Sequence, residues 1–199
     1  MAKGPRYRVP YRRRREHKTD YGARRILATS SSPRFVVRPS GRNLLIQIIR
    51  SEIEGDRVLA QASSSELSKR FGWLGGGKNT PAAYLLGLIA GYRALDGGIE
   101  TAILDMGLRR LTRGSRILAA VRGALDAGLK VPCDSDVMPG AERIEGQAIS
   151  EYAKRLKGLE DPLEYERRFS DYLRRGLRPE DLPAHFREVR ARIEEGHSG

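Results

Sequence analysis

The chain has 199 residues, of which 39% are hydrophobic and 31% are charged, and its formal net charge is +12. Such a chain is long enough for one globular core with some length left over. We expect no membrane partner, because no apolar run approaches the roughly 20 residues of a membrane-spanning helix, and the basic N-terminus lacks the apolar stretch of a secretory signal. Cys133 stands alone and the histidines are scattered, so we expect no disulfide, no metal site and a reducing, cytoplasmic compartment.

The positive charge is concentrated at the N-terminus. Residues 1–25 contain ten lysines and arginines and two acidic residues, whereas residues 150–199 contain eleven of each sign. A dense block of like charge repels itself and stays extended in isolation, and its natural partner is a polyanion. Tyr7, Tyr11 and Tyr21 lie among the arginines, a mixture that suits phosphates and unstacked bases. The segment predicts an RNA-binding arm; a solubilising tail or a localisation signal is the alternative.

Three runs that are typical of strands follow, at residues 34–38, 44–50 and 58–63. The turn sequences PSGRN and EGDR separate them, and turns this short favour an antiparallel arrangement. The sequence SSSELSKRF then predicts a short helix, with a serine as its cap and Glu66 in its first turn.

A glycine-rich loop, GWLGGGKNTP at residues 72–81, almost matches the nucleotide-binding pattern GxxxxGK[ST]. Asn79 stands where the pattern needs a hydroxyl for magnesium, no strand precedes the loop, and Trp73 would crowd the phosphates. We therefore expect no nucleotide. The loop and the helix start at Thr80 can instead hold a phosphate of an RNA backbone. Trp73 would either stack on a base or anchor the loop in the core, and the sequence leaves both open.

The elements after the loop alternate between helices and strands. A helix buried on all sides is expected from Thr80 to about Leu95, a strand at residues 101–106, a helix at 115–128 and a last strand at 129–132. After the antiparallel strands, this order implies an α/β fold with a mixed sheet, right-handed crossovers and helices on the faces. From residue 142 onward, the apolar spacing predicts helices whose balanced charge indicates a solvated face or a surface that docks a protein.

Asp105, Asp134 and Asp136 form the one plausible carboxylate cluster for a nuclease that uses two metal ions. No acidic residue lies in the first strand, where such sites usually begin, and caps and turns explain the three aspartates better. We therefore expect no catalytic residue and no cofactor.

Six sequence blocks between residues 5 and 150 carry a resemblance to a known family. They read RYRVPYRRRREHKTDYGARR, FVVRPSGRNLLIQII, GWLGGGKNTPAAYLLG, AILDMGL, TRGSRILAAVRGALDAGL and RIEGQAI. In this order they resemble the archaeal and eukaryotic branch of the universal large-subunit ribosomal protein family eighteen, the 5S rRNA binders. The resemblance implies a non-catalytic protein of the cytoplasmic ribosome, with a ribonuclease-H-like fold in which three antiparallel strands precede parallel ones.

The resemblance also implies the partners and the domain organisation. Family members bind 5S rRNA, attach it to the large-subunit (23S-type) rRNA, and help to build the central protuberance beside a second 5S-binding protein. We expect an extended basic arm at residues 1–25, a globular α/β rRNA-binding domain at 26–150 and a helical C-terminal extension at 151–199. The resemblance assigns that extension only to packing against ribosomal neighbours.

Four segments are expected to contact rRNA, because they match family blocks that do so. The arm contributes Arg6, Tyr7, Arg8, Tyr11, Arg12, Arg13, Arg14, Arg15, Lys18, Thr19, Tyr21, Arg24 and Arg25. The first turn contributes Arg38, Ser40 and Arg42, the glycine-rich loop contributes Trp73, Lys78, Asn79 and Thr80, and the start of the next helix contributes Arg113, Ser115 and Arg116.

Overall fold

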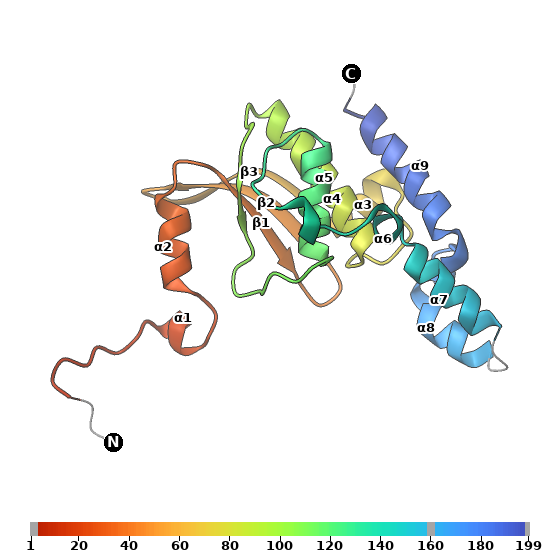
Figure 1. Cartoon of the computed structure of the whole chain (residues 1–199), viewed down its shortest axis with the longest axis horizontal. Coiled ribbons are helices and arrows are strands. Elements are labelled where there is room, and N and C mark those ends of the chain that lie inside the picture. The colour runs from red at the N-terminus through yellow and green to blue at the C-terminus, as the bar shows by residue number, and fades with distance from the viewer. Residues whose placement is uncertain (1–3, 159–161, 198–199) are drawn as a thin grey trace.

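A computed structural model of the chain describes residues 4–158 and 162–197. The elements run in the order shown in Figure 1: α1 (Arg12–Arg15), α2 (Tyr21–Thr29), β1 (Arg34–Pro39), β2 (Leu44–Glu52), β3 (Gly55–Ser63), α3 (Ser64–Phe71), α4 (Thr80–Asp96), β4 (Ile103–Asp105), α5 (Arg116–Asp126), α6 (Ala141–Glu145), α7 (Gln147–Lys157), α8 (Pro162–Arg174) and α9 (Leu182–Glu195). Two short 3-10 helices, η1 (Ser135–Val137) and η2 (Pro179–Asp181), lie between them.

The strands form one mixed sheet in the order β3-β2-β1-β4, which confirms the predicted mixed α/β arrangement. β1 pairs with β2, and β2 with β3, in antiparallel fashion, while β4 runs parallel to β1 and places Asp105 beside Val36. The predicted strand at residues 129–132 is wrong. Only one bridge, between Thr101 and Lys130, forms there, because Pro132 has no N–H with which to continue a ladder.

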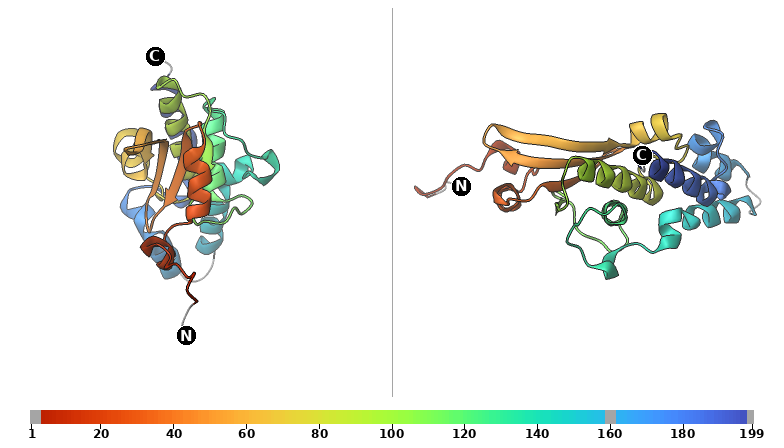
Figure 2. Two further views of the ribbon diagram at one scale, coloured as in Figure 1. Left: turned by 90° about the vertical axis from the view of Figure 1, so that its left-hand side faces the viewer. Right: turned by 90° about the horizontal axis from the view of Figure 1, so that it is seen from above.

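α4 is the central helix of the core, and its burial on nearly all sides confirms the prediction. It lies against one face of the sheet, with α5 packed on it (Figure 2). The two helices approach backbone to backbone: a Cβ on Gly87 would lie 2.0 Å from the carbonyl oxygen of Ala120, and one on Gly123 would lie 2.1 Å from that of Tyr84. Asn79 caps α4, and Thr80 is the first residue of the helix.

The N-terminal segment is partly helical, and the predicted boundary after residue 25 falls inside α2. Asp20 begins this helix by accepting hydrogen bonds from the N–H groups of Gly22 and Ala23. Arg24 attaches the helix to the sheet, since its Nη2 lies 3.0 Å from Asp56 Oδ2 in β3. The residues before α2 project away from the domain (Figure 1).

The C-terminal helices α7, α8 and α9 lie at the other end of the molecule from the arm (Figure 1), and confirm the prediction that residues beyond 142 are helical. Ala153, Leu156 and Phe169 form a small apolar cluster of their own between α7 and α8. α9 joins the main core through Phe186, Val189 and other buried residues. Within the described residues, no helix is long and apolar enough to cross a membrane.

Candidate nucleic-acid interface

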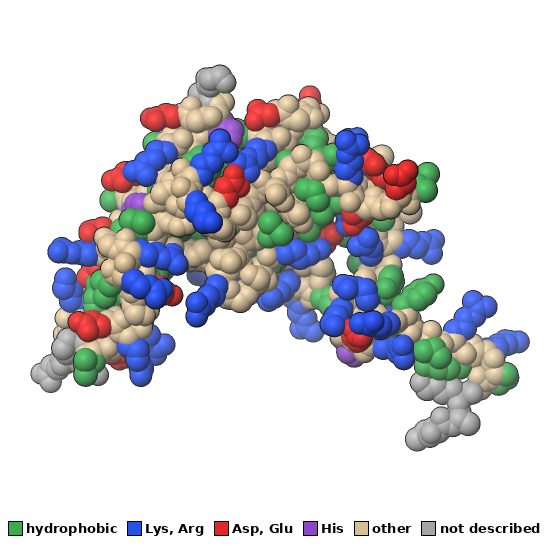
Figure 3. Space-filling model, turned by 180° about the vertical axis from the view of Figure 1, so that it is seen from behind, with side chains coloured by type: hydrophobic (Ala, Val, Ile, Leu, Met, Phe, Trp, Pro, Cys, Tyr) green, Lys and Arg blue, Asp and Glu red, His purple; other side chains and the backbone are tan. Residues whose placement is uncertain are grey.

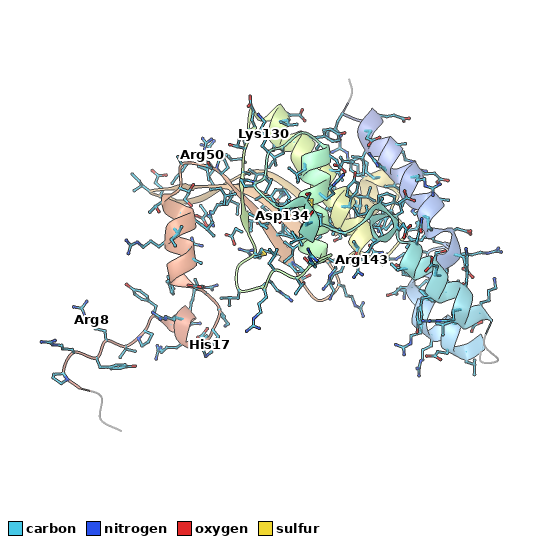
Figure 4. The ribbon with its side chains drawn as sticks, in the orientation of Figure 1. Arg8, His17, Arg50, Lys130, Asp134 and Arg143 are labelled. Carbon is cyan, nitrogen blue, oxygen red and sulfur yellow. The ribbon has the colours of Figure 1, made fainter. Side chains whose placement is uncertain are left out.

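The arm presents its arginines to solvent. α1 consists of four successive arginines with no acidic residue in its turn and with no buried side chain. Glu16 follows directly and pairs with Arg12 at 2.9 Å and with Lys18 at 2.8 Å. These two bonds hold the pKa of Glu16 below its ordinary value, and the bond from Lys18 has the larger effect. The cations nevertheless outnumber this one carboxylate several times, so the arm keeps a strong positive field. Arg8 lies on the projecting part (Figure 4).

Charge is distributed unevenly over the molecule. Lys and Arg side chains surround the arm with few acidic ones among them, whereas both signs are interspersed on the C-terminal helices (Figure 3). The arm also offers flat faces: Tyr7 and Tyr11 are 45% and 72% exposed, and the rings of Tyr11 and Tyr21 lie 5.1 Å apart. Cations beside accessible aromatic rings suit phosphates and unstacked bases.

A cavity of about 560 Å³ lies between the arm and the ends of β1 and β4. The arm and α2 contribute Lys18, Thr19 and Arg24 to its wall, and β1 contributes Arg38. Arg13 and Arg109 also line it, so the wall carries five cationic side chains against two carboxylates. Arg109 was not among the predicted contacts, although the basic pair that follows AILDMGL could have indicated it. The arrangement is suited to phosphate oxygens.

Asp105 is the buried acidic centre of this region. Arg38 Nη2 lies 2.7 Å from its Oδ1, Arg34 Nη1 lies 3.1 Å from its Oδ2, and the N–H of Gly107 donates to Oδ1 at 2.9 Å. Burial opposes ionisation, but the bonds from Arg38, Gly107 and Arg34 outweigh it and hold the pKa of Asp105 below its ordinary value. The carboxylate oxygens are therefore occupied by the protein itself.

The other two aspartates of the hypothetical metal cluster act in local structure. Asp134 caps η1 by accepting a hydrogen bond from the N–H of Asp136. Among the described residues, no three His, Cys, Asp or Glu side chains lie close enough together to hold a metal ion.

The glycine-rich loop, here residues 72–79, is folded tightly and not open like a phosphate cradle. Trp73 is 0% exposed, stacks on His185 with ring centroids 5.3 Å apart, and donates its indole N–H to the carbonyl of Gly76. This corrects the prediction of Trp73 as an rRNA contact, because a fully buried ring has no face for a base. Of the two uses left open by the sequence, Trp73 anchors the loop. A Cβ on Gly75 would lie 2.5 Å from the indole.

The loop meets two other predicted contact segments. Lys78 donates from its ammonium group to the carbonyl of Gly41, in the turn that contains Ser40 and Arg42. Arg116, at the start of α5, donates to the carbonyl of Lys78 at 3.0 Å. The first turn, the loop and the α5 start therefore lie side by side. Asn79 and Ser115 serve as helix caps there, with Oδ1 and Oγ accepting from the N–H groups of Ala82 and Leu118.

The structure thus gathers most predicted side chains into two groups. The first group is the arm with its cavity, and contains Arg6, Tyr7, Arg8, Tyr11, Arg12, Arg13, Arg14, Arg15, Lys18, Thr19, Tyr21, Arg24, Arg25 and Arg38. The second is the surface around the loop, and contains Ser40, Arg42, Lys78, Asn79, Thr80, Ser115 and Arg116, with the exposed Arg113 nearby in sequence.

A mixed α/β domain with a strongly basic arm, and with its internal carboxylates already paired to arginines, has the features of a protein that binds a polyanion. Comparisons with known proteins specify the class further. The chain matches the family described as "Ribosomal large subunit proteins 60S L5, and 50S L18" at residues 5–100 and 96–134. It therefore belongs to this family of large-subunit ribosomal proteins.

Archaeal relatives match the whole chain. A large ribosomal subunit protein uL18 from Caldivirga maquilingensis is 54% identical over 198 residues, which cover 100% of this chain and 95% of the relative. Proteins of the same description from Aeropyrum pernix and Ignicoccus hospitalis are each 51% identical over 197 residues, covering 99% of this chain and 92% and 96% of the relatives. The resemblance read from the six sequence blocks is confirmed, and these relatives are ribosomal proteins and not enzymes.

Proposed function

We propose that this protein is a structural constituent of the large ribosomal subunit that binds 5S rRNA and attaches it to the 23S-type rRNA in the central protuberance, beside a second 5S-binding protein. Family membership supports the ribosomal role. The observation that carries RNA binding is the projecting arm, whose four-arginine turn in α1 makes no buried contact with the domain. We also propose a ribonuclease-H-like topology, with the arm, the α/β domain and the C-terminal extension divided near residues 25 and 150.

Binding by the arm follows from its charge. Each arginine that meets a phosphate releases condensed counterions, so affinity falls as salt is added. A guanidinium can bind a phosphate through two parallel N–H groups, which fixes orientation as well as adding affinity. The cavity beside α2 supplies Arg24, Arg38 and Arg109 from three different segments, so a backbone that enters it is held against the sheet. These contacts position the RNA without reading its sequence.

The surface around the glycine-rich loop provides a second contact. Arg42 and Lys78 lie on adjoining segments, because Lys78 donates to the carbonyl of Gly41 and a Cβ on Gly77 would lie 3.2 Å from the carbonyl oxygen of Arg42. A preformed surface pays little ordering entropy and therefore recognises the shape of an RNA helix or loop. Together, a charged arm and a fixed surface allow one protein to hold two RNA segments.

The test is binding of 5S rRNA by filter retention over a range of salt concentrations. In the variant with Arg12, Arg13, Arg14 and Arg15 replaced by glutamine, we expect weaker binding and a shallower salt dependence, by about 0.7 to 0.9 in slope for each lost phosphate contact. The matched control replaces four arginines of α7 and α8 with glutamine: Arg155, Arg167, Arg168 and Arg174.

The control removes the same charge from helices that carry both signs, so we expect it to keep nearly the wild-type slope. Equal slopes for the arm variant and the wild type would show that the arm makes no phosphate contact. Ready displacement of 5S rRNA by excess duplex DNA at physiological salt would contradict specific recognition of rRNA.

A further inference from the structure

The C-terminal helices contact the glycine-rich loop through several separate bonds. Arg175, directly after α8, donates from Nη1 to the carbonyl of Gly75 at 2.7 Å. Tyr172 in α8 accepts at its hydroxyl from the side-chain amide of Asn79 at 3.0 Å. In α9, His185 accepts at Nε2 from the N–H of Leu74 at 3.1 Å and stacks on Trp73. Residues about one hundred positions apart in sequence therefore hold one short loop.

α9 extends these contacts to the residue before the loop. Arg192 Nη1 donates to the carbonyl of Phe71 at 3.2 Å, at the end of α3. Gly72 follows with a φ of 72°, a conformation that favours glycine, so the chain turns there toward α9. Both ends of the loop, near Phe71 and at Asn79, are thus tied to the C-terminal helices.

The loop depends on these partners because part of its backbone, at Gly75, is buried. Gly75 is buried and its carbonyl accepts from Arg175, while the indole of Trp73 fills the space beneath it. A buried carbonyl or N–H that loses its partner is costly, and a loop relieves that cost by opening to water. The loop would then no longer hold a single conformation.

The opposite side of the same loop carries the second proposed RNA surface. Lys78 bonds to Gly41 in the first turn, and Arg116 bonds to the carbonyl of Lys78. A Cβ on Gly77 would lie 3.2 Å from the carbonyl oxygen of Arg42, so the turn and the loop are in close contact. The loop is therefore the layer between the C-terminal helices and this surface.

We propose that α8 and α9 act as a positioning element, which fixes the glycine-rich loop in one conformation and thereby preorganises the RNA surface formed by the first turn, Lys78 and the start of α5. Tyr172, Arg175 and His185 are its positioning residues, and none of them needs to touch RNA. The effect on RNA binding rests on the proposed function. The fixing of the loop does not, because it is a property of the free protein.

The experiment uses the full-length protein with Tyr172→Phe and Arg175→Ala combined. The control combines Tyr165→Phe with Arg174→Ala, which removes one phenolic hydroxyl and one arginine from the same helix. The control removes the hydrogen bond from Tyr165 to Glu180 and the ion pair of Arg174 with Asp171, and leaves the bonds to the loop in place. Circular dichroism establishes that both variants are folded. Amide hydrogen exchange at residues 72–79 is measured without RNA, and 5S rRNA affinity is measured over a range of salt.

We expect loop amides in the test variant to exchange about tenfold faster, with the amides of α4 unchanged, because two hydrogen bonds that close the loop are absent. We expect 5S rRNA affinity to fall by about three- to tenfold at an unchanged salt slope, since no phosphate contact is lost. The control should match the wild type in both measurements. Arg175→Lys keeps a donor for the carbonyl of Gly75. Its loop exchange rate and its 5S rRNA affinity should therefore lie closer to the wild-type values than those of Arg175→Ala.

Unchanged loop exchange in the test variant would overturn the proposal, as would faster exchange with unaltered RNA affinity. A shallower salt slope without faster exchange would overturn it too, because Arg175 would then contact phosphate directly. Failure of the wild-type protein to bind 5S rRNA would overturn the proposed function instead, and the exchange rates, measured without RNA, would still decide whether the helices fix the loop.

Discussion

Asp105 and Arg34 face each other across two parallel strands, with Arg34 Nη1 lying 3.1 Å from Asp105 Oδ2 and the side chains only 4% and 7% exposed. Arg34 also forms an ion pair with Asp56, whose Oδ1 lies 2.7 Å from Arg34 Nη2. Arg38 completes the surroundings of Asp105 from the solvent side. Ion pairs therefore help to hold the edge strand β4 to β1, because β4 has only three residues and forms few backbone hydrogen bonds.

Removing the carboxylate should destabilise the protein strongly. Asp105→Asn leaves two arginines, Arg34 and Arg38, without the buried carboxylate that lies between them, and breaking a buried pair in this way costs about 3 kcal/mol in the free energy of unfolding. Urea denaturation measures the change. Asp171→Asn is the control, because its pair with Arg174 is exposed and should contribute less than about 1 kcal/mol. Equal losses in the two variants would contradict the importance of the buried pair.

The stability of the loop should depend on pH through His185. Burial lowers the pKa of His185, the carboxylate of Glu188 raises it, and Arg192 lowers it; the net change is downward. Because the folded-state pKa lies below the ordinary value of 6.5, the neutral form stabilises the fold above that pH, and this contribution is lost as the pH falls through the folded-state value. Protonation would also remove the acceptor for the N–H of Leu74.

Urea denaturation at pH 7 and pH 5 tests this dependence. We expect the wild type to lose more stability on acidification than His185→Gln, whose amide accepts the same hydrogen bond but does not titrate. Identical losses would exclude His185 as the group responsible.

Gly75 should tolerate no side chain. A Cβ there would lie 2.5 Å from the indole of Trp73, which is enclosed on all sides, so Gly75→Ala should lower the free energy of unfolding by about 1–3 kcal/mol. Gly41→Ala is the control, because no atom lies within 4 Å of its Cβ position, and it should change stability by less than about 0.5 kcal/mol. Thermal unfolding of both variants compares the two costs. A neutral Gly75→Ala would mean that the loop can move away from Trp73.

Completing the nucleotide-binding pattern should create no nucleotide binding. In Asn79→Ser the new hydroxyl can still cap α4, as serine is a good N-cap, but the loop carbonyls and N–H groups stay directed at Trp73, Arg175 and His185. We expect isothermal titration calorimetry to detect no heat of ATP binding in the variant or in the wild type. Measurable ATP affinity in either protein would refute the structural role of the glycines.

Local signals explain most of what the sequence predicted correctly. The PSGRN turn and the serine that caps α3 each act within a few residues, so they place elements without knowledge of the rest of the fold. The prediction of a strand at residues 129–132 was wrong because it followed from the apolar run alone, whereas Pro132 has no N–H to continue the ladder. The predicted arm ends at residue 25, within α2, because the charge pattern of the arm carries no sign of the pairing of Arg24 with Asp56.

The environment of Trp73 could not be predicted, because its partners lie about one hundred residues away, in helices whose balanced charge indicated only a solvated face or a surface that docks a protein. Tyr172, Arg175 and His185 carry no local pattern that points to the loop. The predicted contacts in the arm and the first turn stay predictions, since their partner is RNA. For these segments the sequence provides the charge and the residue types. Both favour binding to a polyanion, but neither identifies the atoms that touch it.

The separation of charge between the two ends of the molecule has a consequence for how it approaches its target. With a net charge of +8 on the first 25 residues and none on the last 50, the protein carries a permanent electric dipole along its length. In the field of a nucleic acid this dipole experiences a torque, and such steering raises association rates by about 10- to 1,000-fold. We therefore expect the basic end to meet the nucleic acid first, with the electroneutral end facing away from it.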